Sequence, residues 1–140
     1  MMEPLVDNTN AKQMVSPGVP VFTVDLATCT VKDLASKQDF VLTASRNDYV
    51  HGLVGYFDIG FTQGHTIIGF STSPMSRYTH WKQTVFYLHH ELAVSAGEAI
   101  HVQLTCGPNA KNPRDLDIQI GYEWTGATGK VSARQEYRLR

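Results

Sequence analysis

The sequence predicts an all-β domain, either an antiparallel β-barrel or a barrel-like sandwich, with about nine to ten short strands. Three observations indicate this fold class: segments in which apolar and polar residues alternate, turn-forming residues between those segments, and no sustained helical stripe in any window. The chain has 140 residues, which suits one domain because domains most often contain about 100–150 residues. We expect residues 1–18 to be a leader or a severed linker and residues 19–140 to form the barrel domain.

Two alternating segments give the firmest strand predictions. In residues 100–106 every second side chain is apolar, and residues 114–124 repeat the pattern with Leu116, Ile118, Ile120, Tyr122 and Trp124. A period of two residues is typical of a strand with one buried face. A third segment, 47–62, has apolar residues in phase but is interrupted by glycines, which indicates a bulge, a barrel corner or close backbone approach.

Weaker strand candidates complete the prediction, with turn residues between them. The candidates are residues 20–26, 28–34, 40–44, 66–71, 84–88 and 131–139. Residues 95–98 contain small residues and a glycine, a composition that suits a hairpin. A helical turn near residues 33–37 is compatible with the sequence and is the one departure from the all-β pattern.

Composition and charge narrow the function classes. The formal net charge is -1, so no basic surplus points to direct contact with nucleic acid or with an anionic membrane. The apolar runs are shorter than the ~20 residues that a membrane helix needs, and the first residues lack the pattern of a signal peptide. Cys29 and Cys106 have neither zinc-motif spacing nor the pattern of a secreted disulfide framework, so we expect two reduced thiols.

The sequence lacks the motifs of several common enzyme classes, but its histidines leave a metal site open as an alternative. The sequence contains no glycine-rich phosphate loop before a helix and no G-x-S-x-G elbow. We expect His101 to lie in water on the polar face of its strand and His51, in phase with Leu53, to be a hydrogen-bonded core residue. Neighbouring His89 and His90 would point to opposite faces of a strand. A zinc or iron site assembled in space remains an alternative.

The loop at residues 73–83 concentrates the candidate functional side chains. A proline turn precedes Tyr78, Thr79, His80 and Trp81, and strand-like segments flank the loop on both sides. Binding and catalytic residues are often carried by loops on a rigid β scaffold. Composition alone favours a structural interpretation, in which Trp81 plugs the end of the barrel and His80 is a surface residue.

Several segments in order along the chain resemble a known family. They are RNDYVH at 46–51, GFSTSP at 69–74, YTHWKQT at 78–84, PNAKN at 108–112, RDLD at 114–117 and the closing YRLR at 137–140. In this order and spacing they resemble the C-terminal β-barrel half of a type I protein arginine N-methyltransferase. The resemblance is strongest from residue 46 to residue 117. It favours a functional role for the loop over the structural interpretation given above.

The resemblance implies a chemistry that this chain supports only in part. A methyl group passes from S-adenosylmethionine to a guanidinium nitrogen of a protein arginine. The cofactor belongs to an N-terminal Rossmann-type domain, whose motifs are absent from this sequence, so no cofactor is expected in the present chain. The Thr79-His80-Trp81 loop closes one side of the arginine pocket, and the intact triplet is a mark of the enzymes that make asymmetric dimethylarginine.

The family likeness gives each loop residue an expected role. Trp81 forms the pocket wall, because a guanidinium favours an aromatic face by roughly 0.5–2 kcal/mol. His80 has a supporting catalytic role and holds a carboxylate of the opposing domain by a charge-assisted hydrogen bond. Thr79 fixes the loop through a bond from its hydroxyl to the backbone. Tyr78 is a neighbour of the pocket.

The resemblance also implies partners and compartments. The expected partners are proteins with target arginines, such as Gly/Arg-rich segments and histone tails, and the chain's own N-terminal methyltransferase domain. The whole enzyme is expected to form a homodimer in the cytoplasm and nucleus. Acidic side chains that would suit an arginine-rich substrate are Asp48, Asp58, Asp115, Asp117 and Glu123.

The chain by itself is expected to lack activity. The family's dimerisation arm is represented only by residues 3–7, which resemble its exit. We therefore expect the isolated chain to be monomeric and catalytically inactive. The alternative of a different class is a stand-alone β-barrel module that binds Arg-rich protein segments without chemistry.

Overall fold

The computed structural model describes residues 2–140, which form nine strands and two short 3₁₀ helices. The strands are β1 Leu5–Asp7, β2 Ser36–Thr43, β3 Asp48–Gly55, β4 Asp58–Phe61, β5 Ile68–Ser71, β6 Gln83–Val94, β7 Ala99–Pro108, β8 Leu116–Gly126 and β9 Gly129–Leu139; the helices are η1 Ala11–Gln13 and η2 Val31–Leu34. The all-β prediction is confirmed. No helix in this described part of the chain is long and apolar enough to cross a membrane.

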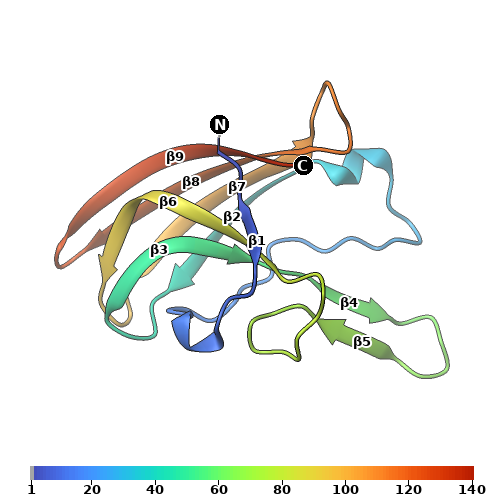
Figure 1. Cartoon of the computed structure of the whole chain (residues 1–140), viewed down its shortest axis with the longest axis horizontal. Helices are drawn as coiled ribbons and strands as arrows, with labels where there is room; N and C mark the ends of the chain where they lie inside the picture. The colour runs from blue at the N-terminus through green and yellow to red at the C-terminus, as the bar shows by residue number, and fades with distance from the viewer. Residues whose placement is uncertain (1) are drawn as a thin grey trace.

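The strands form three antiparallel sheets, with the orders β1-β6-β3, β2-β7-β8-β9 and β4-β5 (Figure 1). In residues 2–140 no ladder between named strands closes the two larger sheets into a barrel, so the fold is a barrel-like sandwich. Figure 1 shows the β4–β5 hairpin extending to one side of this body. Most residues of β4 and the first two of β5 are exposed.

The core lies between the two larger sheets and contains the side chains predicted from the alternation. Its members from β7 and β8 are Ile100, Val102, Ile118, Ile120, Tyr122 and Trp124, all buried. A polar seam joins β9 to β6: the Tyr137 hydroxyl donates to the Tyr87 carbonyl at 2.7 Å, and the Tyr137 ring packs edge-on against Phe86 at 5.2 Å. Burial raises the pKa of Tyr137 to about 12, so this hydroxyl is a donor at all ordinary pH values.

Residues 2–7 contact both large sheets. The Met2 N–H donates to the Glu136 carbonyl and the Met2 carbonyl accepts from Arg138, both in β9. A few residues later β1 pairs with β6, with Asp7 opposite Gln83. The N-terminal segment is therefore a second link between β9 and β6, beside the hydrogen bond from Tyr137 to Tyr87. The division of the chain at residue 18 stays a prediction.

Several local predictions are wrong. Residues 20–26 form no strand, and residues 28–34 end in η2, because the Asp33 carboxylate accepts the Thr30 N–H at 2.7 Å and caps the helix. Segment 47–62 divides into β3 and β4, which belong to different sheets. The turn at 95–98 is not a hairpin, since β6 and β7 pair with other strands and the turn carries the chain from one sheet to the other.

His51 is exposed, not part of the core as predicted. The register of β3 against β6 shifts here: Val50 lies opposite Leu92, but Gly52 lies opposite Tyr87. His51 keeps the exposed phase of Tyr49, whereas Leu53, beyond the bulge in β6, is partly buried against the core. The two residues therefore do not share a face. Its Nε2 lies 3.5 Å from a carboxylate oxygen of Glu91.

Candidate functional site

The loop of residues 72–82 connects β5 to β6, and its first half is closed by serine hydrogen bonds. The Ser76 N–H donates to the Ser73 carbonyl at 3.0 Å, and the hydroxyls of these two residues lie 3.1 Å apart. The Met75 N–H also donates to the Ser73 hydroxyl. The proline turn noted in the sequence is therefore a defined turn that presents the following residues.

Trp81 lies on an aromatic platform at the edge of the β4–β5 hairpin. Its ring stacks on Phe70 of β5 with centroids 5.4 Å apart and planes at 20°, and it meets Phe57 edge-on at 6.0 Å. The His80 imidazole lies 4.0 Å from the indole. Trp81 remains 47% exposed. It does not fill the interior of the sandwich, so the plug interpretation does not hold.

The other two predicted loop residues differ in their surroundings. Tyr78 is 68% exposed and has open access to a partner. The Thr79 hydroxyl is buried without a hydrogen-bond partner among residues 2–140, so the predicted bond to the backbone is wrong. The turn is closed instead by the main chain, because the Lys82 N–H donates to the Thr79 carbonyl at 3.2 Å.

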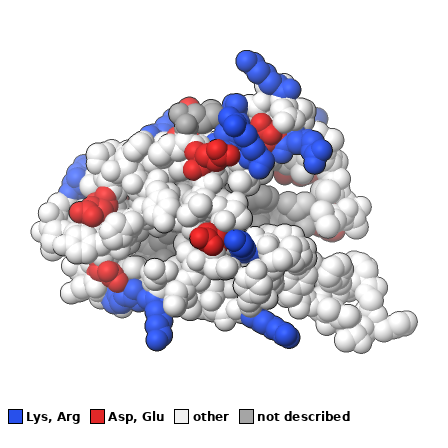
Figure 2. Space-filling model, in the orientation of Figure 1, with Lys and Arg blue, Asp and Glu red and all other residues white. Residues whose placement is uncertain are grey.

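The β4–β5 hairpin and the loop expose several large apolar side chains. Figure 2 shows few charged side chains over the β4–β5 hairpin. Large apolar side chains are exposed there instead: Phe57, Phe61, Ile67, Ile68, Met75, Tyr78 and Trp81. Apolar surface of this kind marks a site of contact with another protein surface or a ligand.

The five acidic residues named from the sequence are spread over β3, β4, β8 and the loop before β8, and two of them are paired with arginine. Asp48 lies 2.9 Å from Arg46, and Asp117 lies 2.9 Å from Arg138. Hydrogen bonds from the Tyr49 backbone and the Arg46 side chain lower the pKa of Asp48. These two carboxylates already have partners and do not form part of a vacant groove.

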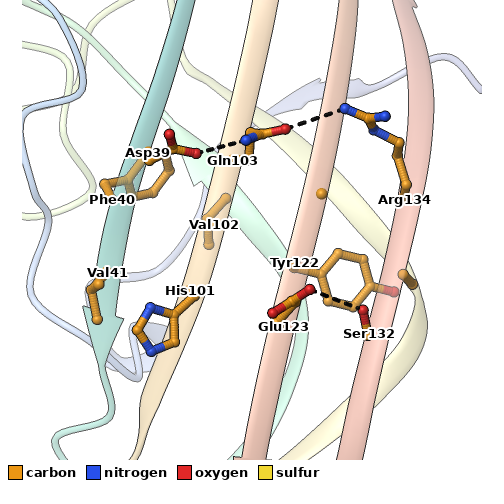
Figure 3. A pocket seen from close by; sticks show the side chains of 12 residues that line it. Asp39, Phe40, Val41, His101, Val102, Gln103, Tyr122, Glu123, Ser132 and Arg134 are labelled. Carbon is orange, nitrogen blue, oxygen red and sulfur yellow. Dashed lines mark hydrogen bonds between the residues drawn. The ribbon is translucent and has the colours of Figure 1, made fainter.

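A hollow lies on the outer face of the four-stranded sheet, apart from the loop (Figure 3). Arg134 reaches across Gly121 to donate to Gln103 at 3.2 Å, and Gln103 donates to Asp39 at 2.9 Å. The charged groups at its two ends are thus joined through Gln103. None of the loop residues predicted from the sequence lines this hollow.

The structure offers no geometry for the metal alternative. Within residues 2–140, no group of three or more His, Cys, Asp or Glu side chains is placed to hold a metal ion. Cys29 and Cys106 are both free thiols. Burial raises the pKa of Cys106, which packs against the core as expected.

Residues 1–127 match the family model described as the arginine methyltransferase oligomerization subdomain. The chain belongs to this family. The family resemblance found in the sequence is thereby confirmed, and the loop with His80 and Trp81 is a feature of a family member.

Relatives and solved structures agree with this assignment. Protein arginine N-methyltransferase 1 of Chlamydomonas reinhardtii is 51% identical over 138 residues, covering 99% of this chain and 40% of that protein. Protein arginine N-methyltransferase 1.1 of Arabidopsis thaliana is 46% identical, covering 100% of this chain and 36% of that protein. The chain thus spans only 36–40% of these relatives' length.

Two solved structures share the fold. Trypanosoma brucei PRMT1, in an enzyme–prozyme heterotetrameric complex with AdoHcy, gives a TM-score of 0.95 at 40% identity and covers 99% of this chain and 44% of that chain. Arabidopsis thaliana protein arginine methyltransferase 10, in an open conformation, gives 0.90 at 22% identity and covers 100% and 43%. The second likeness supports the fold alone.

Sequence reasoning found the exposed loop residues and missed those that hold them. Phe70 and Gln83 lie inside the matched segments 69–74 and 78–84, so that match was an available signal for both. The sequence pattern indicated only that Phe57 lies on the apolar face of a strand. Thr9, which contacts Gln83, had none.

Proposed function

We propose that this domain forms one wall of the arginine pocket in a type I protein arginine N-methyltransferase. The enzyme would transfer methyl groups from S-adenosylmethionine to arginine side chains of proteins, with asymmetric dimethylarginine as the product. The observation that carries the proposal is the exposed His80–Trp81 pair, held on aromatic supports among other exposed apolar side chains. Family membership and the AdoHcy bound in the Trypanosoma brucei structure support it.

The side chains of the loop suit the binding of a guanidinium group. The exposed part of Trp81 can contact the planar cation, and the Phe70 ring stacked on it fixes the angle of the indole. His80 can donate a hydrogen bond to a carboxylate of the opposing domain and so orient the group that grips the substrate. When bound to that domain, S-adenosylmethionine supplies the electrophilic methyl group; the residues of this chain bind, orient and exclude water.

The exposed apolar surface of the hairpin and loop supports the proposed partner, an S-adenosylmethionine-binding methyltransferase domain. Apolar side chains on the hairpin would be covered by that domain. The unsatisfied Thr79 hydroxyl favours a small rearrangement of the loop on contact, since an unpaired buried polar group costs about 1–3 kcal/mol. Gly/Arg-rich segments and histone tails are the proposed substrates, a homodimer the proposed assembly, and the cytoplasm and nucleus the proposed compartments.

The test is a methylation assay with a polypeptide that carries both this domain and the cofactor-binding domain. With a Gly/Arg-rich peptide, His80→Ala and Trp81→Ala should each lower turnover by about 10–100-fold, because displacement of a positioning group has effects of this size. Mass spectrometry should find asymmetric dimethylarginine in the product. Equal turnover at equal folded fraction would contradict the pocket role.

The 140-residue chain alone provides the matching control. It should not methylate the peptide above background, and turnover by this chain would contradict the half-pocket proposal. Tight binding of the peptide by the chain alone, with no methylation when the cofactor-binding domain is present, would favour the stand-alone binding module instead.

A further inference from the structure

The two ends of the 72–82 loop are joined by one buried side chain. Gln83, the first residue of β6, is only 9% exposed. Its Nε2 donates to the Thr72 carbonyl at 2.7 Å, which closes the neck of the loop. Its Oε1 accepts from the Thr9 N–H at 2.8 Å and from the Thr9 hydroxyl at 2.9 Å. The loop is therefore tied at its neck to the N-terminal segment.

The same hydrogen-bond chain continues to the aromatic support of Trp81. The Thr72 hydroxyl is buried, donates to the Phe57 carbonyl at 2.9 Å and accepts from the Phe57 N–H at 3.0 Å. The Phe57 ring then meets the indole edge-on. A shift of Gln83 would therefore move the neck of the loop and one of the two rings that set the indole's angle.

The backbone between the neck and the indole is strained, so it needs a fixed frame. Lys82 has φ 57° and is the only residue other than glycine with positive φ in the described part of the chain. Such a conformation is uncommon for a residue with a side chain and persists where the surroundings determine it. The Lys82 ammonium lies 3.6 Å from Asp7, which is itself paired with Gln83 in the β1–β6 ladder.

We propose that Thr9 and Gln83 are positioning residues that set the pose of the His80–Trp81 pair from the N-terminal segment. This role depends on the hydrogen bonds that join Thr9 to Gln83, Gln83 to Thr72 and Thr72 to Phe57. The effect of these two residues on methylation rests on the proposed function. Their effect on the position of the Trp81 indole does not, so the two effects can be measured separately.

The pose of the indole is measured by ¹⁹F NMR of the 140-residue chain labelled at its two tryptophans. Trp81 reports on the loop, and Trp124, which is 3% exposed, is an internal control. Thr9→Val removes the hydroxyl bond to Gln83 at nearly constant shape, and Thr9→Ser retains that hydroxyl. Gln83→Leu removes all three hydrogen bonds of the Gln83 side chain. Gln119→Leu, on the outer face of β8, removes a similar bond to Glu136 far from the loop.

The expected result is a shifted or broadened Trp81 resonance in Thr9→Val and a larger change in Gln83→Leu. The Trp124 resonance should stay in place, and both Thr9→Ser and Gln119→Leu should leave Trp81 unchanged. An unchanged Trp81 resonance in both Thr9→Val and Gln83→Leu would overturn the proposal. If Gln83→Leu fails to fold, Thr9→Val and its Ser rescue decide the outcome, because Thr9 is only half-buried.

The catalytic consequence is measured in the polypeptide that includes the cofactor-binding domain. Gln83→Leu should lower kcat about tenfold with KM within about twofold, since a misplaced group loses its effect in the transition state. Thr9→Ser should retain the wild-type kcat. A shifted Trp81 resonance with unchanged kcat would uphold the positioning contacts and contradict the proposed pocket function. A loss of kcat in Gln119→Leu as large as that in Gln83→Leu would show a general structural effect and overturn the assignment.

Discussion

Replacing Phe70 by leucine tests whether the aromatic platform serves the indole or only the stability of the hairpin. The Phe70 ring stacks on Trp81 at 5.4 Å and is itself half-buried. Loss of the stacked pair costs about 0.5–1.5 kcal/mol beyond the change in buried area, and leucine keeps much of that area. We therefore expect Phe70→Leu to lower the free energy of unfolding by about 1 kcal/mol.

The effect on turnover should be larger than this loss of stability explains. An indole free to tilt no longer offers a fixed face to the guanidinium, and a displacement of about 1 Å can lower the rate by up to about 100-fold. A domain that keeps most of its stability stays almost fully folded after a loss of about 1 kcal/mol. Turnover at equal folded fraction should thus fall by about tenfold or more.

The assay compares Phe70→Leu with Phe61→Leu in the polypeptide that includes the cofactor-binding domain. Phe61 lies in the same hairpin, is 59% exposed and makes no aromatic contact with Trp81 within residues 2–140. Methylation of a Gly/Arg-rich peptide and urea unfolding are measured for both variants. Equal losses of turnover in the two variants, or a loss in Phe70→Leu that follows the folded fraction, would refute the proposed link between ring stacking and catalysis.

Two further predictions concern Glu98, whose carboxylate joins two turns of the sandwich. Hydrogen bonds from the backbone N–H groups of Ser95 and Ala127 and from the Trp124 indole lower the pKa of Glu98. The contribution of Glu98 to stability is complete above its pKa in the unfolded chain and is lost as pH falls through its lower pKa in the folded chain. The urea midpoint of unfolding should therefore fall between about pH 5 and pH 3. Glu98→Gln should flatten this part of the plot of midpoint against pH, and an unchanged slope would count against the assignment. Gly126→Ala should lower the free energy of unfolding by about 1–3 kcal/mol, because a Cβ there overlaps the Glu98 carboxylate, which three hydrogen bonds hold in place. Gly121→Ala, where the nearest neighbour of the new Cβ would be 3.8 Å away, should cost less. Equal shifts of the melting temperature in the two variants would contradict this reasoning.

The parts of the fold that follow from sequence are those with one clearly buried face. In β7 and β8 every second residue enters the core, so their alternation is read directly from the chain. The bulge in β6 has no such signal, because it shifts the register against β3 and separates the faces of His51 and Leu53 without changing the residue pattern. Apolar content misleads at residues 20–34, where Leu26 and Val31 stay exposed and form no strand.

The candidate site is predictable only in its exposed part. His80 and Trp81 lie within a contiguous segment that resembles a family motif, so they are found together. Their supports come from distant parts of the chain: the hydrogen bond between Thr9 and Gln83 joins residues 74 positions apart. Such a contact depends on the pairing of β1 with β6, and no local pattern in the sequence specifies it.

Photo-crosslinking from the loop to a bound peptide tests most directly whether this loop forms a wall of the arginine pocket. A benzophenone amino acid replaces Tyr78, which is exposed enough to accept it, in the polypeptide with its cofactor-binding domain. With S-adenosylhomocysteine present, we expect crosslinks at or beside the target arginine of a Gly/Arg-rich peptide, and few with the matching lysine peptide. Crosslinks of equal yield to both peptides, or crosslinks that map only to remote positions, would contradict a pocket at this loop.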